Sequence, residues 1–400
     1  MVALPSEFIE QLRSLLGEEA GALINALDRE PVVSIRLNRR KPGAEFPGME
    51  PVAWCPSGYY LPERPEFILD PLLHAGAYYV QDASSMIYEE TLTRIIKTLS
   101  KDFPGSKLNI LDLCAAPGGK TTAMINALPA GGKVTANEYS SKRAGILKEN
   151  LAKWGYPEVI VTNKDSSYYA SIGEAFDIIA VDAQCSCEGM MRKDEFARQQ
   201  WSPQLVEQCS TLQKEILSNA VKALKPGGFL IYSTCTFNRR ENEENAEFLV
   251  RETGMESWNP DFPKEWGIPS GIKTDLPVYR FMPHKTRGEG LFLAVFRKPG
   301  DWSPISSKGK KGIPQKITKD SIPAIEDILD ENQEKTGLPR VELSFEDAIS
   351  YLRRESIAPP GDIPKGPVIV TYKNLNLGAA KNIGSRLNNL YPKNWRILKQ

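Results

Sequence analysis

The stretch that decides the fold reads Leu111-Asp112-Leu113-Cys114-Ala115-Ala116-Pro117-Gly118-Gly119-Lys120. It follows an apolar run that predicts a strand over 108–114, and it leads into a predicted helix over 120–128. Small residues in such a loop let a ligand approach the backbone, and the start of the helix offers unpaired N–H groups to a carboxylate or phosphate. A tight turn needs fewer small residues than this. We therefore interpret residues 114–120 as a ligand-binding loop.

Strands and helices alternate on the carboxyl-terminal side of this loop. Residues 176–182 are almost all apolar, as expected of a central parallel strand that is buried on both faces. Two later apolar runs, 278–282 and 291–297, predict a hairpin at the sheet edge. The alternation predicts a doubly wound, Rossmann-like α/β domain. The other predicted strands are 133–138, 159–163 and 229–233, and the predicted helices are 141–154, 203–224 and 241–253.

Composition divides the rest of the chain. Apolar residues at helical spacing predict helices over 6–28 and 84–99, with a short strand over 32–37 between them. A segment rich in Pro, Gly, Ser and Lys follows residue 299 and is typical of a linker. A helix over 345–353 and a strand over 366–372 predict a small α+β domain after it. The predicted parts are an N-terminal extension at 1–100, the doubly wound domain at 101–299, the linker at 300–335 and a C-terminal domain at 336–400.

Charge is unevenly distributed along the chain, although 50 basic and 50 acidic residues cancel. Residues 372–400 contain six basic and no acidic side chains, and residues 306–319 contain five lysines and no acid. A further basic cluster is formed by Arg36, Arg39, Arg40 and Lys41. Local basic patches of this kind can bind phosphate even in a neutral chain, so a nucleic-acid partner is compatible with the composition.

Several classes of protein are excluded by what the sequence lacks. It contains no apolar run of the roughly 20 residues that a membrane-spanning helix needs, and no secretory signal at residues 1–10. The six cysteines form no disulfide framework, which favours a reducing, cytoplasmic setting. With two histidines and no C-x-x-C pair, we expect no metal site. A monomer is our expectation for the oligomeric state.

The spacing of glycines in the 114–120 loop narrows the choice of ligand that the loop could bind. A P-loop requires glycine where Cys114 stands, and the dinucleotide pattern G-x-G-x-x-G is absent. S-adenosylmethionine remains as the interpretation that fits. Glu138, at the end of the second strand, is placed to hold the ribose hydroxyls, and Asp165, beyond the third strand, to bind the adenine amino group.

Two cysteines follow the last two parallel strands. Cys185 lies in Asp182-Ala183-Gln184-Cys185-Ser186-Cys187-Glu188-Gly189, and Cys235 lies in Ser233-Thr234-Cys235-Thr236. Both positions are at the carboxyl edge of the sheet, where doubly wound domains bind ligands. The other cysteines, Cys55, Cys114 and Cys209, are interpreted as small buried apolar residues.

This placement predicts a specific reaction, methylation of carbon 5 of cytosine. Carbon 5 is a poor nucleophile until a thiolate adds to carbon 6, and Asp182 is placed to stabilise the adduct near N3. A base then removes the carbon 5 proton, and a second thiol suits the release of the first. Because the base must leave its stack to be reached, single-stranded or opened RNA is the natural substrate.

The sequence resembles the Nop/Sun family of RNA 5-methylcytosine methyltransferases, and its bacterial ribosomal-RNA branch in particular. The resemblance covers nearly the whole chain. Its motifs are Arg36-Leu37-Asn38, Gln81-Asp82-Ala83-Ser84-Ser85-Met86, the 115–120 loop, Asn137-Glu138 with Arg143, and Ser233-Thr234-Cys235-Thr236 with Glu241-Asn242-Glu243.

The resemblance implies roles for individual residues. Cys235 is implied to be the nucleophile and Cys185 to assist release, while Lys120, Asp165 and Asp182 match the family's lysine and aspartates. The C-terminal segment, with 388–392 and Trp395-Arg396, is similar to a PUA-like RNA-binding domain, and the N-terminal extension is implied to bind RNA as well. Small-subunit ribosomal RNA is the implied substrate, and transfer RNA stays open. The implied cofactor contacts are Cys114, Ala115, Ala116, Pro117, Gly118, Gly119, Lys120, Glu138, Arg143, Asp165 and Asp182.

The chain departs from the family pattern Asp-Ala-Pro-Cys-Ser-Gly at two positions. Gln184 replaces the proline that would stiffen the loop, and Cys187 replaces the glycine. If that glycine position requires a positive φ, Cys187 is strained by roughly 1 kcal/mol or more. These departures leave open an RNA-binding or ribosome-assembly protein that binds cofactor without turnover. A DNA cytosine methyltransferase, with Cys185 as nucleophile, is disfavoured by the Thr-Cys motif and the basic C-terminal domain.

Overall fold

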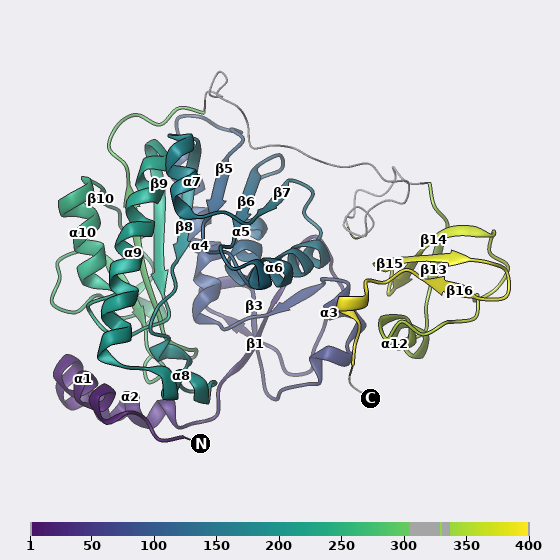
Figure 1. Ribbon diagram of the computed structural model, residues 1–400, viewed down its shortest axis with the longest axis horizontal. Helices are drawn as coiled ribbons and strands as arrows, with labels where there is room; N and C mark the ends of the chain where they lie inside the picture. Colours follow the sequence, from purple (N-terminus) through teal and green to yellow (C-terminus); the bar gives the residue numbers. More distant parts are fainter. Residues whose placement is uncertain (1, 305–328, 330–336, 399–400) are drawn as a thin grey trace.

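The computed structural model describes residues 2–304, 329 and 337–398, which form three β-sheets with their surrounding helices (Figure 1). Most of the predicted linker, 300–335, lies outside the described residues. No helix in the described part of the chain is long and apolar enough to cross a membrane.

The central sheet has eight strands and the predicted doubly wound order. Five consecutive strands, from β9 to the edge strand β7, are parallel, and β10, β11 and β12 pair antiparallel at the other side. The chain runs from β5 outward through β6 to β7 and then returns to β8 on the other side of β5. Across the sheet the strands are β10 (Glu256–Ser257), β12 (Leu291–Arg297), β9 (Leu224–Thr234), β8 (Phe176–Asp182), β5 (Asn109–Asp112), β6 (Lys133–Asn137) and β7 (Val159–Thr162), with β11 (Val278–Phe281) paired to β12.

Helices cover both faces of this sheet, because successive side chains of its buried strands point to opposite faces. In β8, Ile178 and Ala180 pack with residues of α4, α5 and α6, whereas Ile179 and Val181 pack with residues of α7, α9 and α10. Figure 1 shows these two helical layers with the sheet between them. The first layer consists of α4 (Ile87–Leu99), α5 (Gly119–Ala127) and α6 (Ser141–Trp154), and the second of α7 (Ser166–Ile172), α9 (Pro203–Ala223) and α10 (Glu243–Thr253).

Most of the predicted helices and strands are confirmed, with two corrections. The strand predicted over 229–233 begins earlier than expected, since β9 starts at Leu224 and its Gly227 and Gly228 pair with Lys298. The predicted hairpin of β11 and β12 is confirmed at the sheet edge, where β11 and β10 pair with different parts of β12 on the side away from β9. The single helix predicted over 6–28 is divided into α1 (Ser6–Leu16) and α2 (Ala20–Leu27), since Gly17 adopts a φ of 58° and a 3-10 turn follows.

The N-terminal region contains a small antiparallel sheet, of which the sequence predicted only β1. The helices α1 and α2 pack against Trp201 and the helix α8 (Glu195–Gln200) of the central domain, with Phe8 5.4 Å from Trp201 between ring centroids. The strands are, in order, β2 (Glu50–Val52), β3 (Cys55–Leu61), β1 (Val33–Leu37) and β4 (Tyr78–Val80), and the short helix α3 (Pro71–His74) precedes β4.

The C-terminal region is a four-stranded sheet with one helix, in agreement with the predicted small α+β domain. Its apolar side chains share one core with the N-terminal sheet, and α3 contacts both α12 and β15. The Lys41 ammonium, buried beside this core, donates to the carbonyl oxygens of Ala75, Lys153 and Leu329. The elements are β13 (Arg340–Glu342), α12 (Phe345–Leu352), β14 (Gly366–Tyr372), β15 (Leu375–Asn382) and β16 (Leu387–Asn389).

Candidate active site

The candidate site lies where the order of the central strands reverses. The strands β5 and β8 are neighbours there, and the loops after their carboxyl ends hold the predicted ligand loop and the Cys185 motif. The Cys235 motif follows β9, which is the next strand. Doubly wound sheets bind their ligands at this position, so the topology brings together three segments that are far apart in the sequence.

The backbone of the loop after β5 adopts a conformation that requires small residues, as the sequence predicted. Gly118 adopts a φ of 111° at the start of α5, and a Cβ there would lie 3.3 Å from Leu147 Cδ1. Ala115 N–H donates to Asn137 O (2.8 Å), and Arg143 Nη2 donates to Ala116 O (2.8 Å). These bonds fasten the loop to β6 and α6, beside the first N–H groups of α5.

The predicted ribose and adenine acids differ in their surroundings. Glu138 is buried, and its Oε1 accepts from Ser140 N–H (2.9 Å). Its Oε2 accepts no hydrogen bond within the described residues and lies 3.4 Å from Arg143 Nη1. Asp165 is exposed and caps α7, where its Oδ1 accepts from the N–H and hydroxyl of Ser167. The pKa of Asp165 is lowered by these bonds.

The third predicted acid, Asp182, is held by a chain of polar side chains at the end of β8. Lys120 Nζ donates to Asp182 Oδ2 (2.7 Å), and Ser233 Oγ donates to Asp182 Oδ1 (2.6 Å). The hydroxyl of Tyr88 lies 2.8 Å from Ser233 Oγ. Burial lowers the pKa of Lys120, but Asp182 together with Cys235 and Asp112 raises it, so the net shift is upward and the ammonium stays protonated.

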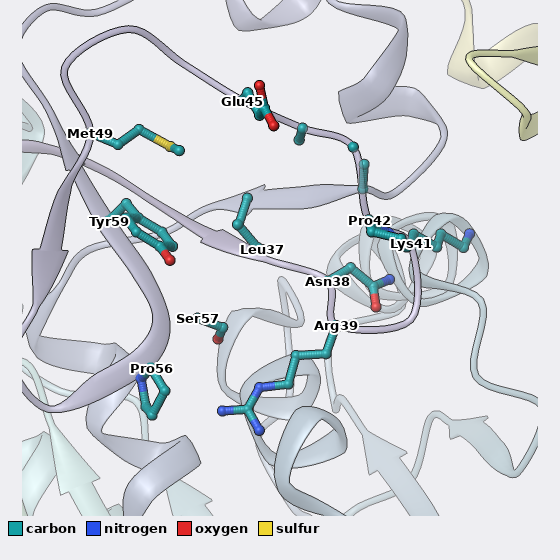
Figure 2. Close-up of a pocket in the computed structure, with 13 residues that line it drawn as sticks. Leu37, Asn38, Arg39, Lys41, Pro42, Glu45, Met49, Pro56, Ser57 and Tyr59 are labelled. Carbon is teal, nitrogen blue, oxygen red and sulfur yellow. The ribbon is translucent and has the colours of Figure 1, made fainter.

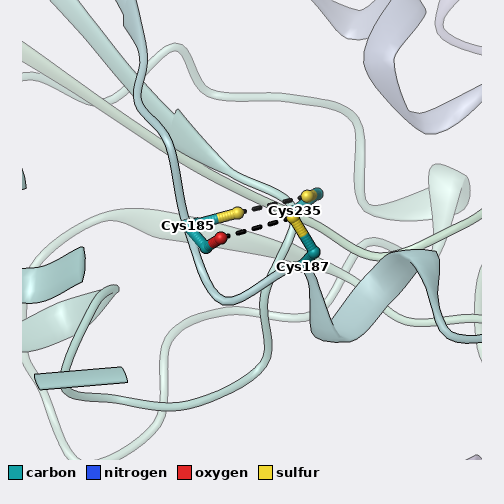
Figure 3. A group of neighbouring side chains, drawn as sticks. All are labelled: Cys185, Cys187 and Cys235. Carbon is teal, nitrogen blue, oxygen red and sulfur yellow. Dashed lines mark hydrogen bonds between the residues drawn. The ribbon is translucent and has the colours of Figure 1, made fainter. Parts of the chain in front are cut away.

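Three thiols from the loops after β8 and β9 meet one another (Figure 3). Cys185 Sγ lies 3.2 Å from Cys235 Sγ, and Cys187 Sγ lies 3.3 Å from the carbonyl oxygen of Cys185. All three sulfurs lie within 4.8 Å of one another. The pKa of Cys187 is lowered, because its thiolate accepts hydrogen bonds from Cys185 and Cys235. Hydrogen bonding to Cys187 and Cys235 and burial raise the pKa of Cys185.

Two buried carboxylates join the two cysteine loops, a feature that the sequence did not reveal. Glu188 Oε2 accepts from the backbone N–H groups of Phe237 (2.6 Å) and Asn238 (2.9 Å). In the opposite direction, Glu241 accepts from Ser186 N–H (3.0 Å) and Ser186 Oγ (2.5 Å). Burial and the nearby Glu188 raise the pKa of Glu241 to about 7. Glu241 belongs to a family-like motif, but its partners are about 50 positions away and cannot be read from spacing.

Cys187 occupies the left-handed region, with φ 59° and ψ 29°. The condition given above for strain at Cys187, a positive φ, is therefore met. A Cβ is unfavourable in that region, whereas glycine occupies it freely.

Replacing Cys187 with glycine is expected to stabilise the protein by about 0.5–1 kcal/mol, because relief of backbone strain exceeds the added entropy of the unfolded glycine. Urea unfolding followed by circular dichroism measures this change. Cys187→Ala is the matched control, since it removes the sulfur but keeps the Cβ and should not gain stability. Equal stability of both variants would contradict strain at this position.

A separate pocket of about 370 Å³ lies beside the N-terminal sheet (Figure 2). Arg39, which lines it, forms an ion pair with the buried Glu89 (2.5 Å). The predicted site residues do not line it. The labelled lining residues are Leu37, Asn38, Arg39, Lys41, Pro42, Glu45, Met49, Pro56, Ser57 and Tyr59.

Comparison with known families gives matches along most of the chain. Residues 103–297 match 16S rRNA methyltransferase RsmB/F, residues 4–83 match the N-terminal domain of 16S rRNA methyltransferase RsmF, and residues 338–397 match the methyltransferase RsmF PUA domain. The last match agrees with the PUA-like domain that the resemblance implied.

Two curated relatives carry the description ribosomal RNA small subunit methyltransferase F. The protein from Pectobacterium atrosepticum is 33% identical over 325 residues, covering 77% of this chain and 66% of the relative, slightly less than two thirds. The protein from Cronobacter sakazakii is 30% identical over 477 positions, covering 98% of this chain and 96% of the relative.

Solved structures share the fold. NSun6 from Pyrococcus horikoshii, determined with SFG, is 23% identical, with a TM-score of 0.61 over 74% of this chain and 99% of that chain. A methyltransferase homologue from the same organism is 24% identical, with a TM-score of 0.61 over 74% of this chain and 95% of that chain.

Proposed function

Since the chain belongs to the 16S rRNA methyltransferase RsmB/F family, we propose that it methylates carbon 5 of a cytosine in small-subunit ribosomal RNA. Membership of this family agrees with the family resemblance that the sequence motifs indicated. The observation that carries the choice of cytosine carbon 5 is the 3.2 Å separation of Cys185 Sγ and Cys235 Sγ beside the ligand loop. Paired thiols at the ends of neighbouring strands suit a reaction that forms and then breaks a sulfur–carbon bond.

S-adenosylmethionine is the cofactor, and it supplies the methyl group when it is bound. The residues present fit this group. Glu138 offers a buried carboxylate oxygen with no hydrogen-bond donor in the described residues, as a ribose hydroxyl requires. The first turn of α5 offers N–H groups, and Gly118 and Gly119 leave the backbone accessible. We assign the remaining contacts to Cys114, Ala115, Ala116, Pro117, Lys120, Arg143, Asp165 and Asp182.

Cys235 is the proposed nucleophile at carbon 6 of the base. The hydrogen bond with Cys185 lowers its pKa, but Cys187 and burial raise it by more, so the net shift is upward. Its proton must therefore leave before attack, and the thiol is only partly buried, so solvent can accept the proton. Addition at carbon 6 makes carbon 5 electron-rich, which is what methylation there requires.

Asp182 is proposed to hydrogen-bond to the adduct near N3, and the Lys120 ammonium to balance the negative charge that gathers there. Their ion pair keeps a protonated donor beside a carboxylate at the end of β8. After methylation, the carbon 5 proton is removed and the Cys235 sulfur leaves, which restores the aromatic ring. Cys185, in contact with that sulfur, is proposed to assist the departure.

RNA is the proposed partner of the two flanking regions. The C-terminal domain matches a PUA domain and carries the basic residues that suit phosphate contacts. Opened RNA is the proposed form of the substrate, since a stacked cytosine cannot reach a thiol in a loop. The proposed setting is the cytoplasm, and the proposed form is a monomer.

Incubation of the protein with methyl-labelled S-adenosylmethionine and unmodified 16S rRNA tests this proposal. The expected result is label at a single cytosine, mapped as 5-methylcytosine by bisulfite sequencing. Transfer RNA and DNA serve as parallel substrates. Cofactor binding without methylation of any substrate would favour the alternative of an RNA-binding assembly protein, while label on transfer RNA or DNA alone would overturn the ribosomal assignment.

A further inference from the structure

Three sulfur atoms from two loops lie at the spacing of a metal site. Cys185, Cys187 and Cys235 place their Sγ atoms within 4.8 Å of one another (Figure 3). With zinc–sulfur bonds of about 2.3 Å in tetrahedral geometry, ligand sulfurs stand about 3.8 Å apart. Cys185 Sγ and Cys235 Sγ lie 3.2 Å apart, and no two of the three sulfurs are more than 4.8 Å apart, a range that includes this value. The remaining adjustment required for all three sulfurs to contact one ion is on the order of 1 Å.

The backbone holds these loops together without a metal. Gly189 N–H donates to the carbonyl oxygen of Cys235 (2.7 Å), and a Cβ at Gly189 would lie 2.7 Å from that oxygen. The Glu188 and Glu241 carboxylates add side-chain bonds between the same two loops. The left-handed backbone of Cys187 turns its side chain back toward the other two thiols. A preformed arrangement of ligands lowers the cost of ordering them around an ion.

The chemistry of the three sulfur ligands determines which kind of metal ion the cluster prefers. Thiolates are soft ligands that prefer zinc, cadmium and copper(I) to magnesium or calcium. Asp182 is already paired with Lys120 and Ser233, which leaves a fourth coordination position for water. Cys187 and Cys235 are only partly buried, so an ion has access to the cluster.

We propose that Cys185, Cys187 and Cys235 form a binding site for one thiophilic divalent ion of the zinc and cadmium class. Binding replaces each remaining sulfur-bound proton with a metal–sulfur bond and releases these protons to water, with no change of oxidation state. The sequence expectation of no metal site missed this cluster, since its third ligand stands 50 positions from Cys185. Metal binding and RNA methylation compete for Cys235, a consequence that rests on the proposed function.

Cadmium titration of the full-length protein tests the site directly. The protein is reduced, treated with a chelator, and followed by the ultraviolet charge-transfer absorbance of cadmium–thiolate bonds. One equivalent is expected to bind, with an absorbance typical of three such bonds. Cys187→Gly is expected to bind about tenfold or more weakly and with a smaller absorbance per ion, because one ligand is lost. This variant keeps both proposed catalytic thiols and a backbone suited to its position, so loss of folding does not explain the change.

Cys209→Ser is the matched control, since Cys209 lies in α9 outside the cluster and its loss should leave titration unchanged. The proposal is overturned if the reduced wild-type protein gives no charge-transfer band, or if Cys187→Gly binds as tightly as the wild type. It is also overturned if the protein, after reduction, binds no cadmium and forms a Cys185–Cys235 disulfide during the titration instead. Because the readout is absorbance, failure here is distinct from failure of the methylation assay.

Discussion

Cys235→Ala is expected to abolish methylation, lowering the rate by about a thousandfold or more, because no other group is proposed to add to carbon 6. Without that addition, carbon 5 remains too weak a nucleophile to accept the methyl group. Transfer of labelled methyl groups to 16S rRNA measures the loss. Binding of S-adenosylmethionine, measured by calorimetry, should be nearly unchanged, since Cys235 follows β9 and the ligand loop follows β5.

Cys209→Ala controls for the loss of a thiol as such. This cysteine is buried in α9, and its replacement should retain methylation. If Cys235→Ala retained methylation while Cys185→Ala lost it, the two thiols would have exchanged roles, as in the disfavoured DNA methyltransferase interpretation. Retention by both variants would exclude the covalent mechanism.

Cys185→Ala is expected to leave the protein covalently attached to its RNA. Methylation should proceed once, and release should then slow, because the sulfur in contact with Cys235 is gone. Labelled RNA that migrates with the protein on a denaturing gel measures the trapped adduct. We expect the adduct to account for most of the active protein, and turnover to fall by about a hundredfold or more.

The double variant Cys185→Ala/Cys235→Ala separates a true adduct from tight binding, since it should show no RNA on a denaturing gel. Free protein and normal turnover in Cys185→Ala would contradict the release role. In that case Cys187, the third sulfur of the cluster, becomes the first candidate for the group that assists release.

The fold of the central domain could be predicted because its local signals agree with its packing. The strand Phe176–Asp182 is apolar along its length, and it is buried on both faces. The helix Ser141–Trp154 was predicted with its correct bounds, and Gly155 ends it with a φ of 75°. The strands β2 and β3 were missed because Gly58 and the nearby prolines disfavour a strand locally. Tertiary packing overrides this, since a Cβ at Gly58 would meet Met86 Sδ at 2.6 Å.

The candidate site could be predicted only in part. The predicted strand ends and the composition of the loops indicated Lys120, Glu138, Asp182, Cys185 and Cys235 as candidates. This was possible because the carboxyl ends of parallel strands lie at the same edge of the sheet. The bonds that position them were not predictable from spacing. The carboxylates of Glu188 and Glu241 join loops that are about 50 residues apart, and Tyr88 reaches Ser233 from a helix in another part of the chain. Burial of a charged group is a tertiary property, and no local pattern marks it.

The core shared by the N-terminal and C-terminal sheets constrains how the protein matures during its own synthesis. Lys41 hydrogen-bonds to the carbonyl oxygen of Leu329, 288 positions later in the chain, and the partners of the N-terminal sheet follow beyond residue 340. At a translation rate of about 5–20 residues per second, the first sheet waits on the order of tens of seconds for those partners. A nascent chain therefore completes its catalytic domain before its first sheet is covered, and this exposed apolar face is where chaperones would act during translation.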